Sequence, residues 1–122
     1  MVAERRVLRI EIGTLEDALG QFADAWRGAE RGEQVRPYEG VGFESLGELL
    51  ATLTPRRWTA IERLRGEGPM TVYALAKALG RNYKNVHGDV KALEGLGIIE
   101  RDPGGRVLVP WDEVEAHLRI AA

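Results

Sequence analysis

Cysteine is absent from this 122-residue chain, and histidine and serine are nearly so. Without cysteine the chain has no zinc finger, iron–sulfur cluster, thiol nucleophile or disulfide framework. The two histidines, His87 and His117, are far apart, and neither has a carboxylate or a second histidine four residues later, as a helical metal site needs. The one serine, Ser45, has no histidine near it in the sequence and is suited to capping a helix. We therefore expect no enzyme: no catalytic residue, no metal and no cofactor.

Long hydrophobic runs are also missing. No apolar stretch approaches the roughly 18 residues that a membrane span requires, and the N-terminal segment MVAERRVLRIEIG lacks the apolar centre of a signal peptide. We therefore expect a cytoplasmic protein without membrane contact. Since 44% of the residues are hydrophobic, a chain of this length can bury a core without a disulfide or metal.

Positive charge is concentrated in the middle of the chain, although the net charge is −2. Residues 1–54 contain 6 Lys+Arg and 10 Asp+Glu, residues 55–106 contain 10 and 6, and residues 107–122 contain 1 and 3. A basic centre between acidic flanks is typical of a protein that presents one face to phosphate. Ordinary scatter of charge is the alternative interpretation.

A strand and a helix are predicted near the N-terminus. Polar and apolar residues alternate over Arg6–Ile12, which is typical of a strand with one apolar face. Gly13 ends this pattern, and Thr14 with Asp17 three residues later resembles a capping box. Apolar residues then recur at helical spacing until about Gly32. So short a chain with such an apolar stripe needs a packing partner, for which a second copy is the natural candidate.

A connector and two further helices are expected next. Residues 32–42, GEQVRPYEGVG, are interrupted by glycine and proline, and GVGF lacks the third glycine and the preceding strand of a phosphate loop. A short helix is expected over Phe43–Leu53. Thr54 and Pro55 then supply the N-cap and the first residue of a longer helix, which is ended by Gly66 or by Gly68 and Pro69. The residues expected to face inward are Phe43, Leu46, Leu49, Leu50 and Leu53 in the short helix, and Trp58, Ile61 and Leu64 in the longer one.

The next two helices are separated by a tight glycine turn, which is the helix-turn-helix arrangement. Thr71 caps the segment VYALAKAL, Gly80 stops it, and the second helix runs over Asn82–Leu96. The segment DPGG between Ile98–Arg101 and Arg106–Val109 predicts the turn of a β-hairpin, or wing.

A C-terminal helix is expected after the hairpin, begun by Pro110, Trp111 and Asp112. The predicted fold class is mainly α with a small β-hairpin (α+β): a winged helix-turn-helix with an N-terminal strand and helix and a C-terminal helix, which dimerises. Residues 1–42 form the expected N-terminal extension for dimerisation or partner contact, and residues 43–122 the DNA-binding domain. Either the extension or the C-terminal helix forms the dimer interface. Tryptophans 26, 58 and 111 are expected in the core or in dimer contacts.

The helix over Asn82–Leu96 has two chemically different sides. With Val86 inward at 100° per residue, Tyr83, Val90 and Leu93 lie on the same side. Asp89 and Glu94 are expected at the sides, so the outer face has no carboxylate. That face carries Lys84, Gly88, Lys91 and Gly95, and it is flanked by Arg81, Asn85, His87 and Ala92. It is typical of a recognition helix, in which asparagine suits an adenine edge and lysine suits phosphate or guanine. A solvated face with incidental lysines is the alternative.

The segment Leu53–Arg106 resembles a winged helix-turn-helix of the MarR-like class. FESLGELLATLTPRRW followed by ALGRNYKNVHGDVKALEGLGIIER resembles small prokaryotic antitoxin-type transcriptional regulators. This resemblance implies a homodimeric repressor that binds double-stranded DNA, with a recognition helix over Asn82–Leu96 and a wing tip at Asp102–Arg106. It also implies a toxin as a possible cognate partner. A winged helix that holds a partner protein instead of DNA is the alternative function.

The candidate DNA-binding residues follow from these patterns. A wing arginine can enter the minor groove, and the start of a helix can hold a phosphate. Arg56 and Arg57 oppose the dipole of their helix, so they either bind phosphate or an acidic patch or are tolerated surface charges. The complete candidate set is Thr71, Arg81, Asn82, Lys84, Asn85, His87, Gly88, Lys91, Arg101 and Arg106.

Overall fold

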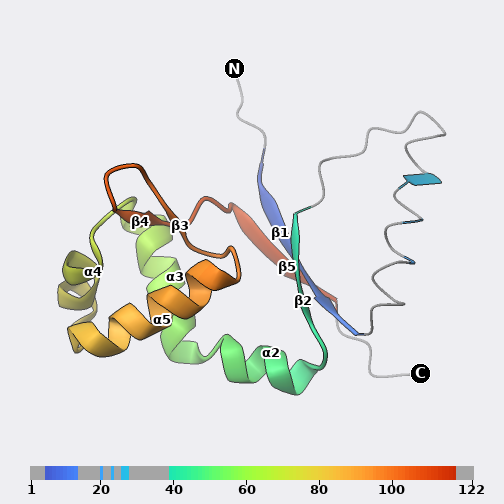
Figure 1. Ribbon diagram of the computed structural model, residues 1–122, viewed down its shortest axis with the longest axis horizontal. Helices are drawn as coiled ribbons and strands as arrows, with labels where there is room; N and C mark the ends of the chain where they lie inside the picture. Colours follow the sequence, from blue (N-terminus) through green and yellow to red (C-terminus); the bar gives the residue numbers. More distant parts are fainter. Residues whose placement is uncertain (1–4, 14–19, 21–22, 24–25, 28–38, 118–122) are drawn as a thin grey trace. The chain divides into compact units, whose positions relative to one another are not determined.

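The computed structural model describes residues 5–13, 20, 23, 26–27 and 39–117 of the chain (Figure 1). These residues form a mixed α/β protein, compatible with the predicted α+β class, whose helices and two small sheets divide into two compact units. One unit contains residues 5–6 and 52–113, and the other contains the remaining described residues. None of the helices in this part of the chain has both the length and the apolar character needed to cross a membrane.

The smaller of the two units, called the sheet unit below, contains the three-stranded sheet and is built on the predicted N-terminal strand. Strand β1 (Val7–Ile12) lies between β2 (Gly40–Phe43) and β5 (Glu113–Ala116). β1 and β2 are parallel and place Ile10 beside Val41. Leu8 and Ile10 are buried, as the alternation predicts, so one face of the strand packs in the core.

Two predictions in this unit are wrong. The expected connector over residues 32–42 ends in strand β2, where Val41 and Phe43 alternate with glycines and the backbone pairs with β1. The expected C-terminal helix is absent from the described residues: Glu113–Ala116 is strand β5, because the sequence EVEA alternates polar and apolar residues and joins the sheet that contains β1. Both strands depend on a distant partner, which local spacing does not show.

The predicted helix from Thr14 to Gly32 lies largely outside the described residues. Of its residues, only Gly20, Ala23, Trp26 and Arg27 are described, and these four are helical.

Helix α2 (Leu46–Thr52) begins later than predicted because Phe43 belongs to β2. The Ser45 hydroxyl accepts a hydrogen bond from the Glu48 amide at 3.1 Å, so Ser45 caps the helix as expected. Leu49 is buried, but Leu46 and Leu50 are exposed, so the predicted inward stripe is wrong at both positions.

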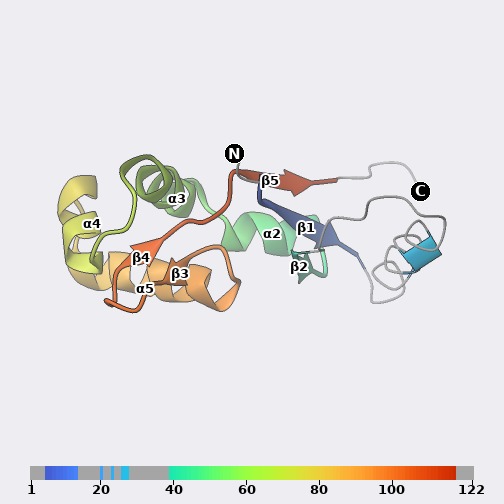
Figure 2. The ribbon, with the colours of Figure 1, turned by 90° about the horizontal axis from the view of Figure 1, so that it is seen from above.

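The larger unit contains helices α3 (Pro55–Glu67), α4 (Val72–Leu79) and α5 (Tyr83–Gly95) and a hairpin, which can be followed in Figures 1 and 2. These helices begin at the predicted caps. The short strands β3 (Glu100–Arg101) and β4 (Val107–Leu108) pair antiparallel. The core of this unit is apolar and includes Leu64, Leu75, Val86, Leu93, Ile98 and Val107. The predicted helical boundaries are therefore confirmed to within one or two residues.

The caps explain why these three helices start where they do. Thr54, Thr71 and Asn82 each have extended backbone and accept hydrogen bonds from amides of the first helical turn. Gly80 ends α4 in the left-handed conformation with φ 64°, which a residue without Cβ adopts at little cost. The turn that results brings α4 and α5 into contact.

Two aromatic residues of this unit differ from the sequence prediction. Trp58 is 38% exposed, because Ala60 rather than Trp58 lies on the buried side of α3 with Ile61 and Leu64. Tyr83 is 49% exposed at the start of α5, where the helix extends beyond the core. Trp111 is buried as predicted, and its indole N–H donates to the carbonyl of Gly97 at 2.9 Å.

Candidate nucleic-acid interface

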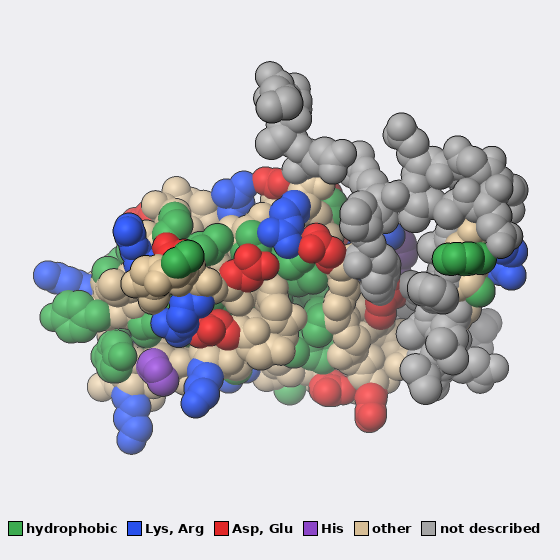
Figure 3. All heavy atoms as spheres, turned by 45° about the horizontal axis from the view of Figure 1, so that its top comes forward, with side chains coloured by type: hydrophobic (Ala, Val, Ile, Leu, Met, Phe, Trp, Pro, Cys, Tyr) green, Lys and Arg blue, Asp and Glu red, His purple; other side chains and the backbone are tan. Residues whose placement is uncertain are grey.

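The outer face of α5 is exposed along its whole length. Val86, Val90 and Leu93 are buried on the opposite side, as the helical wheel predicts. Most residues predicted to face outward are exposed, and the exceptions are Arg81 and Ala92, which are partly covered. The exposed ones are Lys84, Asn85, His87, Gly88, Lys91 and Gly95. Figure 3 shows basic side chains and a histidine over the end of the protein where Figure 1 places α4 and α5.

The two lysines of this face have no acidic partner among the residues that the structure describes. The carboxylates of α5 are directed elsewhere: Glu94 binds Arg101 and Asp89 is buried. Because no carboxylate reaches the outer face, Lys84 and Lys91 keep their full charge available for an external anion.

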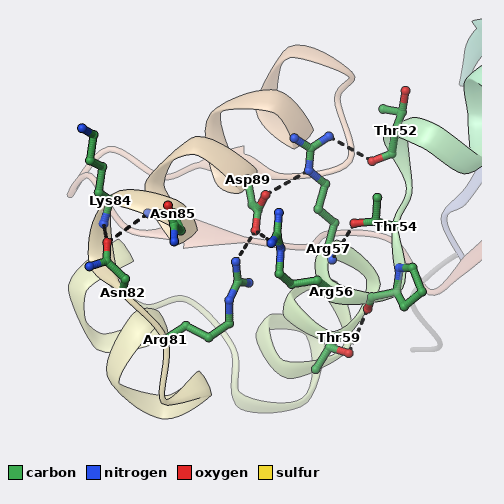
Figure 4. Close-up of polar contacts among 11 residues, drawn as sticks. Thr52, Thr54, Arg56, Arg57, Thr59, Arg81, Asn82, Lys84, Asn85 and Asp89 are labelled. Atoms are coloured by element: carbon green, nitrogen blue, oxygen red, sulfur yellow. Dashed lines mark hydrogen bonds and ion pairs between the residues drawn. The ribbon is translucent and has the colours of Figure 1, made fainter.

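Asp89 lies within the unit and binds three arginines (Figure 4). Its Oδ1 accepts from Nε of Arg57 at 3.0 Å, and its Oδ2 accepts from Nη2 of Arg81 at 2.7 Å. Nε of Arg56 lies 3.4 Å from the same Oδ2. Arg57 also donates to the carbonyl of Thr52 at 3.0 Å. This arginine cluster (Arg56, Arg57 and Arg81 around Asp89) joins the start of α3, the α4–α5 turn and the middle of α5.

The cluster keeps Asp89 ionised in spite of its burial. Burial raises the pKa of Asp89, but hydrogen bonds from Arg81 and Arg57 and the charge of Arg56 outweigh it and leave the pKa below its ordinary value. The wheel alone predicts Asp89 at the side of the helix, and its side chain is instead 3% exposed. The signal that points to it is the pair Arg56 and Arg57, two arginines at a helix N-terminus without an acidic residue in the first turn.

The arginines of the hairpin differ in their pairing. Arg101 donates to Glu94 at 2.6 Å and to the carbonyl of Gly105 at 3.1 Å, and the bond to Glu94 raises the pKa of Arg101. Arg106 is more exposed, and its nearest carboxylate, Asp102, lies 3.9 Å away. Arg106 is therefore the hairpin arginine that is more available to an external partner.

The remaining candidates have local structural roles. Asn82 caps α5 by accepting from the amides of Lys84 at 2.8 Å and Asn85 at 3.4 Å. Thr71 caps α4 by accepting from the amide of Ala74 at 3.1 Å. The prediction that Arg81 flanks the outer face is wrong, because Arg81 turns inward to Asp89 in the arginine cluster. The structure thus gathers most candidates on or beside α5 and leaves Thr71 at the start of α4.

An aromatic pair borders the lysine face. The rings of Tyr83 and His87 are tilted by 35° with centroids 5.8 Å apart, one helical turn from each other. Sequence reasoning places Tyr83 inward and so does not include it in the site. Its exposed ring adds an apolar contact surface next to Lys84, of the kind that packs on a thymine methyl group.

Two further features of the described residues concern metal binding and cavities. These residues contain no group of three or more histidines and carboxylates placed to hold a metal ion. An open hollow of about 290 Å³ in the sheet unit is lined by Arg9, Ile10, Glu11, Glu115 and His117, where Arg9 and Glu115 form an ion pair.

Comparison with known proteins gives one family. The family described as HVO_A0114 matches residues 52–116, just over half of the chain. No curated protein matches the chain, and no solved structure does. The matched residues contain α3, α4, α5 and the hairpin, so the candidate interface lies within the part that the family shares.

Proposed function

The chain belongs to the HVO_A0114 family, and we propose that it is a homodimeric transcriptional repressor that binds a specific sequence of double-stranded DNA through α5. The observation that carries this proposal is the outer face of α5, which exposes Lys84, Asn85 and Lys91 without a carboxylate. An exposed helix with this chemistry matches the dimensions and the hydrogen-bonding groups of the major groove.

The geometry of α5 supports a division of roles within the groove. Asn85 presents an amide that can pair with both adenine N6 and N7, while Lys84 and Lys91 bind guanine or phosphate. Gly88 lies between them on the exposed face, and a Cβ there meets no atom within 4 Å. Because Gly88 has no side chain, the helix backbone can approach the base edges closely.

The hairpin supports a second contact. It follows α5 directly, and Arg106 is exposed and forms only a long ion pair of 3.9 Å with Asp102. In this proposal α5 occupies the major groove and Arg106 reaches the adjacent minor groove, as a wing does. Binding as a dimer places two copies of α5 on two half-sites of one operator.

A salt titration tests the proposal. Fluorescence anisotropy with a labelled duplex from the region upstream of the protein's own coding sequence should show saturable binding that weakens steeply with salt. Unrelated duplexes of the same length should bind more weakly. Lys84→Glu with Lys91→Glu should abolish binding, and Lys84→Arg with Lys91→Arg should retain most of it because the charge remains. Equal affinity for every duplex, or no binding at low salt, would refute the proposal.

A protein-binding module is the second candidate function. It is favoured by Leu46 and Leu50, which lie one turn apart on α2 and are both exposed, Leu50 by 62%. In this alternative the chain binds a partner protein, such as the toxin that the sequence resemblance implies. The double lysine-to-glutamate variant separates the two functions, because capture of the partner should survive it and DNA binding should not.

A further inference from the structure

The arginine cluster holds more positive charge than its carboxylate neutralises. Three guanidinium groups surround Asp89, which leaves two positive charges uncompensated by it. Arg56 and Arg81 both bind the same oxygen, Oδ2, so these two groups are close neighbours in spite of their like charge. A site with this excess attracts an additional anion.

The three arginines differ in which of their N–H donors are not used within the protein. Arg57 uses its guanidinium on Asp89 and on the carbonyl of Thr52. Nη1 of Arg81 is buried and has no hydrogen-bond acceptor among the described residues. The side chain of Arg56 is 59% exposed, and in this part of the chain its only polar contact is the one with Asp89. Arg56 therefore has exposed donors that are not used within the protein, whereas the unused donor of Arg81 is buried beside it.

The position of these donors relates them to α5. Arg81 immediately precedes Asn82, the N-cap of α5, and Asp89 ties Arg56 to the same helix (Figure 4). A recognition helix contacts bases with its N-terminal residues, so groups that flank this end face the phosphates at the edge of the groove. Guanidinium is the group best matched to a phosphate, because it donates in pairs.

We propose that Arg56, held in place by Asp89 and next to the positive charge of Arg81, binds one backbone phosphate of duplex DNA. The proposal rests on the DNA-binding function proposed above and adds a contact from α3 that lies outside the lysine face. Asp89 acts in it as a positioning residue, since it touches the arginines and not the phosphate.

The first test measures the salt dependence of Arg56→Gln. Loss of one phosphate contact should reduce the slope of log K against log salt by roughly 0.9 for each bound subunit. Arg63→Gln is the matched control, since Arg63 is on the same helix, is comparably exposed and pairs only with Glu67 at 3.2 Å. Both variants lose one positive charge. If the slope of log K against log salt is the same in the two variants, Arg56 makes no specific phosphate contact and the proposal is overturned. Thermal unfolding checks that both variants fold.

The second test locates the phosphate on the DNA. In the shortest duplex that retains binding, each phosphate is replaced in turn by an uncharged methylphosphonate. Wild type should lose affinity at one position in each half-site, and Arg56→Gln should be insensitive at that position. If every position has the same effect in both proteins, the inference is wrong. Absence of any salt-dependent binding by wild type would instead refute the function on which it rests.

A third experiment distinguishes binding of a DNA backbone phosphate from binding of free phosphate ion. Melting temperatures are compared in sodium phosphate and in sodium chloride of equal ionic strength. A phosphate-specific rise that Arg56→Gln abolishes, with the DNA salt slope of that variant unchanged, would assign the site to free phosphate and overturn the DNA contact. No phosphate-specific rise, together with the reduced slope, supports it.

Discussion

Among single residues, Asp89 connects stability to the candidate interface. It is a buried carboxylate whose three arginine partners come from α3 and from the turn before α5. Removal of one partner from such a buried arrangement leaves uncompensated charge, which is far more costly than the loss of a surface ion pair. The orientation of α5 against α3 therefore depends on this side chain.

We predict that Asp89 gives the fold an acid-sensitive component. Its pKa is lowered in the folded protein, so the native state binds fewer protons than the unfolded state near the ordinary aspartate pKa. This stabilisation is complete above the unfolded pKa of about 3.9 and is lost as the pH falls through the lower folded pKa. Asp89→Asn should be less stable than wild type by about 3 kcal/mol at pH 7.

Urea unfolding followed by circular dichroism at pH 7 and at successively lower pH values measures this difference. The difference in the free energy of unfolding between wild type and Asp89→Asn should become smaller as the pH falls. Glu67→Gln is the control, because Glu67 takes part only in an exposed ion pair with Arg63, and it should change stability by less than about 1 kcal/mol. If this difference in unfolding free energy does not change with pH, ionised Asp89 does not stabilise the fold as we predict.

The residues that sequence reasoning misplaces have a common cause. Arg57 is 32 residues from Asp89 along the chain, so no local pattern links them. Tyr83 has the correct spacing for the inward side, but it is in the first turn of α5 and remains half exposed. Helical spacing predicts which side of a helix a residue occupies, whereas burial depends on whether another element covers that turn.

At the scale of elements, α5 combines a rigid inner side with an exposed glycine on its outer side. Gly88 is in the helix interior, where glycine costs up to ~1 kcal/mol relative to alanine. Nothing lies within 4 Å of a Cβ added there, so the cost is not imposed by packing within the described residues. The close approach of α5 to DNA that we propose provides a reason for it.

We predict that Gly88→Ala stabilises the protein by up to ~1 kcal/mol and weakens its binding to DNA. The added methyl group removes backbone entropy from the unfolded chain and also separates the helix from the groove. Thermal unfolding and anisotropy measure the two effects. Gly66→Ala on α3 is the control, since Gly66 is also helical with open space around its Cβ, and it should raise stability alone. Unchanged DNA affinity in Gly88→Ala would contradict the close approach.

Some helices and strands can be predicted from the sequence close to them, and others cannot. Helices α3, α4 and α5 are predictable because Thr54, Thr71 and Asn82 cap them within three residues of their own sequence. Strands β2 and β5 are not, because glycine in the one and glutamate in the other weaken the signal and the stabilising pairing is with a distant strand.

At the scale of the whole molecule, the proposed function requires two copies of the chain. We predict that size-exclusion chromatography with light scattering gives twice the mass of 13.5 kDa. A DNase I footprint should then cover two half-sites one helical turn apart, or a multiple of that distance. Leu50→Glu tests whether the exposed side of α2 takes part in self-association. A monomer at all concentrations would remove the model of two half-sites.

The sheet has a consequence for the order in which the protein assembles. β5 is synthesised about a hundred residues after β1, so the three-stranded arrangement is completed late in translation. The helices of the other unit rely on neighbours close in sequence and can form while the chain is still growing. A chain that ends before residue 113 therefore keeps α3, α4 and α5 but leaves one edge of β1 unpaired, and an unpaired edge of this kind promotes aggregation.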